Sequence, residues 1–82
     1  MVATAYVLIS VEAGKAREVY DELSKIDGVQ HLDAVSGPYD IVATIQGADF
    51  NAIGIIVLDR IQAIKGITDT ITLNVLKFEN CF

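Results

Sequence analysis

The sequence has few of the side chains that carry out chemistry. It contains one histidine, one cysteine and no tryptophan. A catalytic site needs several reactive groups that converge, and neither His31 nor Cys81 has an evident set of partners in the sequence. There is also no CxxC, HxH or HExxH spacing, and no carboxylate cluster, to ligate a metal. We therefore expect no catalytic residue, no metal and no cofactor.

Other scarcities bear on the cellular location. A single cysteine, Cys81, cannot build a disulfide framework within the chain and argues for a reducing compartment. The N-terminus lacks the basic region and cleavage site of a signal peptide. The longest apolar run, Ile55–Leu58, is far shorter than the ~20 residues of a membrane span. These features predict a cytoplasmic protein with no membrane partner.

Positive charge is scarce as well. The chain has 6 Lys and Arg against 11 Asp and Glu, which gives a net charge of −5, and its basic residues are scattered along the sequence. Binding to nucleic acid needs a basic patch that displaces the counterions of the phosphates. We therefore expect no direct contact with nucleic acid.

Apolar residues, in contrast, are abundant. Hydrophobic residues make up 52% of the 82 positions, and the length allows one domain, 1–82. A single core of this size rarely supplies more than ~3–5 kcal/mol by itself. Some of the apolar surface is therefore expected to be covered by another subunit.

Periodicity predicts the fold class. Runs of alternating or β-branched residues predict strands. Helical spacing of apolar residues predicts two helices, the first of which ends at Asp27-Gly28. The other predicted elements are the strands Thr4–Val11, Val29–Ser36, Ile41–Gln46 and Ile67–Phe78 and the second helix, Phe50–Ile64. The order βαββαβ predicts an α+β, ferredoxin-like domain: a four-stranded antiparallel sheet with both helices on one face.

Two apolar surfaces remain to be covered in such a domain. The bare face of the sheet would carry apolar side chains, among them Tyr6, Leu8, Leu32 and Val42, and would favour dimerisation. The second helix is apolar well beyond one face. Either a loop or a strand edge covers this wide stripe, or the helix lies partly in a subunit contact.

Two segments are candidate binding sites. The turn Ser36–Asp40 is explained by hairpin chemistry alone, or else it is a ligand loop in which Asp40 meets a polar head group and Tyr39 covers it. Thr68, Thr70 and Thr72 form either a solvated strand face or a row of hydroxyls suited to a carboxylate.

Four segments in order resemble the effector-binding (RAM) domain of the Lrp/AsnC family: Ala5–Ile9, Asp27–Val29, Ser36–Ile41 and Lys65–Thr72. The resemblance implies a ferredoxin-like domain that pairs sheet to sheet, as a dimeric α+β barrel, and builds octamers or similar rings. It also implies that a free amino acid binds between neighbouring dimers. The ligand-binding residues carried over are Gly37, Pro38, Tyr39, Asp40, Thr68, Thr70 and Thr72, with the Asp40 carboxylate as a partner for the α-ammonium group.

Typical members of this family also carry a helix-turn-helix, whereas this chain begins at the first strand of the effector domain. It therefore resembles the stand-alone form, an amino-acid-binding homo-oligomer in transcription regulation that could also join full-length regulators. Two alternatives stay open: a ligand-free oligomerisation module that co-assembles with such regulators, and a cofactor-free enzyme on a dimeric α+β barrel.

Overall fold

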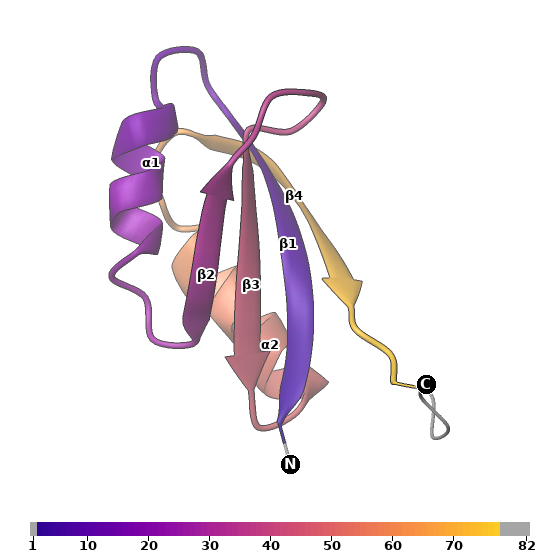
Figure 1. Ribbon diagram of the computed structural model, residues 1–82. Coiled ribbons are helices and arrows are strands. Elements are labelled where there is room, and N and C mark those ends of the chain that lie inside the picture. The colour runs from indigo at the N-terminus through magenta and orange to yellow at the C-terminus, as the bar shows by residue number, and fades with distance from the viewer. Residues whose placement is uncertain (1, 78–82) are drawn as a thin grey trace.

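The computed structural model describes residues 2–77 (Figure 1). Its elements follow the predicted order of strands and helices. They are β1 (Ala3–Val11), α1 (Ala16–Leu23), β2 (Val29–Ala34), β3 (Ile41–Gly47), α2 (Phe50–Ile56), its continuation as a π-helical turn η1 (Val57–Ile61), and β4 (Ile67–Asn74). The strands form one antiparallel sheet in the order β2-β3-β1-β4. This is the predicted ferredoxin-like α+β fold.

The core lies between the sheet and the helices, which cover one face only (Figure 1). Alternate residues of the two central strands point into it, as the period of two along a strand requires. The buried residues come from β1, β3, α1, α2 and η1: Ala5, Val7, Ile9, Val19, Leu23, Ile41, Ala43, Ile45, Ile53, Val57 and Ile61. Among residues 2–77 no polar or charged side chain is buried, so apolar packing defines this core.

Several predicted ends were wrong by a few residues. Strand β2 ends at Ala34, two residues early, because the N–H of Val35 already donates to the carbonyl of Asp40 across the turn (2.9 Å). Strand β4 ends at Asn74, opposite Ala5, and one more hydrogen bond joins the N–H of Val75 to the carbonyl of Thr4 (2.9 Å). The predicted end of that strand, Phe78, and the cysteine Cys81 lie outside the described residues.

The first helix also ends earlier than predicted, at Leu23 instead of Asp27. A turn follows it, in which the N–H groups of Lys25 and Ile26 donate to carbonyls three residues back (3.2 and 3.1 Å). Gly28 has a positive φ of 98°, but close packing also requires a glycine there. An added Cβ would lie 2.9 Å from Cδ1 of Ile56 and 3.1 Å from the carbonyl oxygen of Gln46.

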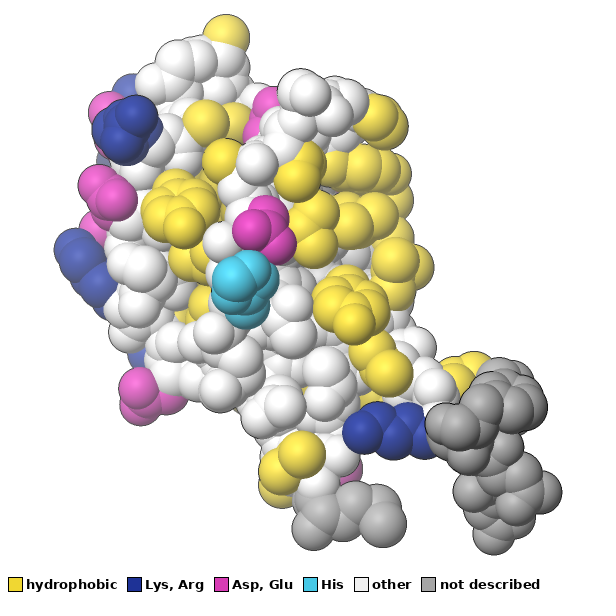
Figure 2. All heavy atoms as spheres, in the orientation of Figure 1, with side chains coloured by type: hydrophobic (Ala, Val, Ile, Leu, Met, Phe, Trp, Pro, Cys, Tyr) yellow, Lys and Arg dark blue, Asp and Glu magenta, His cyan; other side chains and the backbone are white. Residues whose placement is uncertain are grey.

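The placement of Leu32 on the bare face of the sheet was wrong. Leu32 pairs with the buried Ala43 and packs against the core. A bulge between Val29 and His31 is the cause, because one extra residue shifts the alternation of side chains along β2. The other three predicted residues are on the bare face, where β4 adds Ile71 and Leu73 beside Tyr6 and Leu8. Figure 2 shows apolar side chains gathered over β1 and β4 on this face.

Candidate functional site

The hairpin turn between β2 and β3 is fastened to the end of β1 through Asp40. The Asp40 N–H donates to the carbonyl of Ile9 (2.9 Å), and its carboxylate Oδ2 accepts a hydrogen bond from the Val11 N–H (2.9 Å). Gly37 has a positive φ of 148°, and Gly37 and Pro38 are exposed. Tyr39 and Asp40 are partly buried. The turn is therefore held to β1 by one backbone hydrogen bond and one side-chain hydrogen bond.

Thr70 and Thr72 of β4 lie on the side of the sheet that carries the helices. Thr70 pairs with Ile9 and Thr72 with Val7, and both partners are core residues. The threonines nevertheless keep solvent access, because β4 is an edge strand, the second helix packs chiefly over β1 and β3, and the first packs against β2. Gln62 Nε2 donates to Thr70 Oγ1 (3.0 Å), which fixes the orientation of that hydroxyl.

These threonines form one wall of a groove of about 320 Å³ between β4 and the second helix. The polar wall consists of Thr70, Thr72 and Asn74, and the facing wall is largely apolar. The facing residues are Phe50, Ile53, Gly54, Val57, Leu58 and Gln62. No lining residue carries a formal charge, so the groove combines neutral hydrogen-bonding groups with apolar contacts.

Seven of these lining residues were not predicted as site residues: Phe50, Ile53, Gly54, Val57, Leu58, Gln62 and Asn74. A signal for five of them was present. Asn74 continues the period-two row of Thr70 and Thr72 along the strand. Phe50, Gly54, Leu58 and Gln62 recur every fourth residue and so form one row along the helix. Which row of the helix lines the groove depends on how the helix packs on the sheet, and the helical period does not reveal this.

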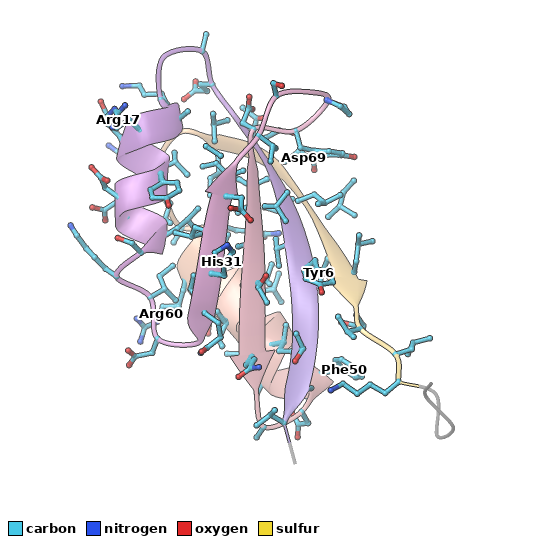
Figure 3. All side chains as sticks on the ribbon, viewed as in Figure 1. Tyr6, Arg17, His31, Phe50, Arg60 and Asp69 are labelled. Atoms are coloured by element: carbon cyan, nitrogen blue, oxygen red, sulfur yellow. The ribbon has the colours of Figure 1, made fainter. Side chains whose placement is uncertain are left out.

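The turn and the threonines approach the same end of the sheet but are separated within one subunit. Ile9 of β1 contacts Asp40 on one side and pairs with Thr70 on the other, so β1 lies between them. Thr68 and Thr70 line a second hollow of about 280 Å³, with Gln62, Ile67 and Asp69. The turn residues line neither of these two hollows. Figure 3 shows Asp69 at the end of the sheet from which the turn projects.

Two further groups of polar side chains lie outside these hollows. His31 Nε2 lies 3.2 Å from Asp33 Oδ2, and both side chains are largely exposed on β2. Between α1 and η1, a hollow carries charges of both signs, and a hydrogen bond from Lys25 to Glu22 (3.0 Å) raises the pKa of that lysine. Within residues 2–77 no three His, Cys, Asp or Glu side chains group as metal ligands would.

The described part of the chain contains no helix with the length and apolar character needed to cross a membrane.

The fold and these segments place the chain in a family. Residues 4–79 match the model of the Lrp/AsnC ligand binding domain, and the chain belongs to the Lrp/AsnC family. An HTH-type transcriptional regulator of Pyrococcus furiosus is 33% identical over 73 residues, which cover 85% of this chain and 49% of that protein. The chain thus spans about half the length of this curated relative.

Relatives of a second type are named as an enzyme and not as a transcriptional regulator. Homocitrate synthases of Saccharolobus islandicus are 38% identical over 73 residues, 85% of this chain but only 16% of the synthase.

Solved structures share the fold. A protein of Thermus thermophilus superimposes with a TM-score of 0.88 at 25% identity, over 96% of this chain and 99% of that one. A transcriptional regulator of Neisseria meningitidis, solved as a complex with L-Met, gives a TM-score of 0.81 at 27% identity. The similarity covers 96% of this chain and 53% of the regulator.

Proposed function

We propose that this chain is an amino-acid-binding regulatory unit that works as a homo-oligomer in the cytoplasm and carries out no reaction. One observation carries the proposal: Thr70 and Thr72 stand uncovered beside an apolar groove, in a member of a ligand-binding family. Hydroxyl groups both donate and accept hydrogen bonds, so this row suits the α-carboxylate of a free amino acid. The complex of the Neisseria regulator with L-Met supports an amino acid as ligand.

The ligand site is proposed to form between subunits. In one subunit β1 separates the turn residues from the threonine row, so a small molecule would not touch both. A neighbouring subunit brings them together: the turn that Asp40 holds, with Gly37, Pro38 and Tyr39, from one chain, and Thr68, Thr70 and Thr72 from the other. The groove is uncharged, and Phe50 and Leu58 offer apolar contacts. A neutral amino acid with an apolar side chain is therefore the favoured ligand.

Assembly is proposed to use both exposed apolar surfaces. The bare sheet face pairs with that of a second copy and forms a homodimer, a dimeric α+β barrel. The outer side of the second helix, with Ile55 51% and Leu58 65% exposed, then joins dimers into an octamer or a similar ring.

We propose that DNA is contacted by other domains or protein chains and not by this unit. The net charge of −5 disfavours binding to phosphates by this unit. Its relatives in Pyrococcus are named HTH-type regulators and are about twice as long. A full-length Lrp/AsnC regulator is therefore a suitable hetero-oligomeric partner, whose response this unit would change.

A second candidate function is the control of a biosynthetic enzyme. The Saccharolobus homocitrate synthases, at 38% identity, have a matching segment that makes up a sixth of their length. The same ligand site would then transmit an amino-acid signal to an enzyme instead of to a DNA-binding domain. Co-purification with a metabolic enzyme, and not with a regulator, would favour this candidate.

The test of ligand binding is thermal unfolding of the purified protein with each of the twenty amino acids at millimolar concentration. A ligand at 100 times its Kd stabilises the native state by about 2.7 kcal/mol, which is a clear shift. We expect shifts from a few neutral, apolar amino acids and none from lysine or glutamate. No shift from any of the twenty would refute the ligand site and leave the ligand-free oligomerisation module.

A further inference from the structure

At the end of β1, the Asp40 carboxylate takes the place of a backbone carbonyl as the hydrogen-bond acceptor of the Val11 N–H. Ile9 and Ile41 are the last pair in the register of β1 and β3, and the Asp40 N–H donates to Ile9 just beyond it. Beyond this point β3 no longer lies beside β1. The Val11 amide, two residues further along β1, donates to the Asp40 carboxylate instead of to a backbone carbonyl (2.9 Å). One side-chain oxygen thus extends the ladder past its last backbone pair.

Val11 connects this clamp to the start of β4. A bulge lies between Ser10 and Val11, and beyond it Val11 pairs with Ile67. The next residue, Glu12, donates its N–H to the carbonyl of Gly66 (2.7 Å). The segment that fixes where β4 begins is therefore hydrogen-bonded to Asp40. The contact thus links the turn to the segment from which the strand of the threonine row begins, in addition to the pairing of β1 with β3 and β4.

We infer that Asp40 is a positioning residue of the ligand site and acts through the Val11 amide rather than through contact with the ligand ammonium group. This inference rests on the proposed function. The carboxylate is partly buried, and one of its oxygens already accepts a hydrogen bond. A bond between a carboxylate and a backbone N–H is charge-assisted and short, so it holds the turn firmly. Loss of the acceptor would leave a partly buried amide without its partner.

The variants Asp40→Asn and Asp40→Ala separate the two roles. Asparagine keeps an oxygen that can accept from Val11 but has no negative charge, whereas alanine has neither. Asp27→Asn is the matched control, because it removes one charge from an exposed turn at the opposite end of the sheet. With the amino acid that gives the largest thermal shift, we expect a Kd within threefold of wild type for Asp40→Asn and Asp27→Asn. For Asp40→Ala we expect at least tenfold weaker binding.

A second readout needs no ligand. Hydrogen exchange measured by mass spectrometry on a peptide containing Val11 should be at least tenfold faster in Asp40→Ala and within threefold of wild type in Asp40→Asn. Unchanged exchange in Asp40→Ala would overturn the clamp. Normal exchange in Asp40→Asn, together with binding as weak as that of Asp40→Ala, would instead assign the carboxylate to the ligand. If no amino acid binds, the proposed function fails, and the exchange result alone decides whether Asp40 holds the turn.

Discussion

Tyr6 and Leu73 face each other across β1 and β4, and each side chain is nearly half exposed, at 44% and 47%. The next pair on the same face is Leu8 with Ile71, so four apolar side chains form a continuous block on the bare side of the sheet. Scattered apolar residues are normal on a protein surface, whereas a contiguous group of this kind marks an interaction site. The bare face is therefore where association can be tested directly.

Leu73→Glu should dissociate the oligomer at this face. The variant places a charge in the centre of the apolar block, where a partner subunit would have to desolvate it. In size-exclusion chromatography with light scattering, we expect the wild type to have a mass well above 8.9 kDa and the variant to have a lower mass, because only the contact through the second helix would remain. Thr72→Glu is the control, since the neighbouring side chain points to the other side of the sheet and should leave the dimer intact. A wild-type protein that is monomeric at micromolar concentration would contradict this assembly.

Leu58→Glu tests the second surface, the outer side of the helix. If this side joins dimers into a ring, the charge should reduce the mass to that of a dimer but not to that of a monomer. Asn51→Glu introduces the same charge at an exposed polar position of α2 and should keep the full assembly. A ring of unchanged mass in Leu58→Glu would show that this exposed leucine has no part in assembly.

Most of the fold could be predicted because the sequence pattern is locally consistent. Along residues 41–46 one face of the strand carries three apolar residues and the other carries only Val42, so burial of Ile41, Ala43 and Ile45 is the favoured choice. The failures have local causes as well. The bulge after Val29 turned Leu32 to the core, and no composition signal marks a bulge at Gln30. The first helix ended at Leu23 because Ser24–Asp27 forms turns that the helical period does not reveal.

The candidate site could be predicted in part. The turn and the threonines were singled out as segments, but their separation by β1 follows from the strand order, which is set by long-range pairing. Asp40 illustrates the limit. A carboxylate in a turn suggests a ligand contact as readily as a structural one, and only the position of Val11, 29 residues away in sequence, reveals its hydrogen bond.

Substitution of Gly28 and of Gly54 by alanine should change the free energy of unfolding in opposite directions. Gly28→Ala should lower the free energy of unfolding by at least about 1 kcal/mol, because alanine is strained at positive φ and its Cβ would meet Ile56 and the Gln46 carbonyl. Gly54→Ala should raise it by about 0.5–1 kcal/mol, since this helical position has open space around an added Cβ. Urea denaturation at one fixed protein concentration measures both. Equal effects of the two substitutions would contradict the packing described at Gly28.

Thr70→Val and Thr72→Val should weaken ligand binding without loss of the fold. Each variant keeps the β-branched shape that suits a strand but removes a hydroxyl from the groove wall. Thr70→Val also removes the acceptor of the Gln62 amide, which would otherwise help to orient that wall. We expect each to raise the Kd about tenfold, or ~1.4 kcal/mol, by calorimetry with the best ligand of the thermal screen.

Thr44→Val on the bare face of the sheet is the control and should bind as the wild type does. The double variant Thr70→Val/Thr72→Val decides the matter: if its Kd equals that of the wild type, the hydroxyl row does not hold the ligand. The site would then have to be sought elsewhere, beginning with the turn, where the Asp40 variants already provide the measurement.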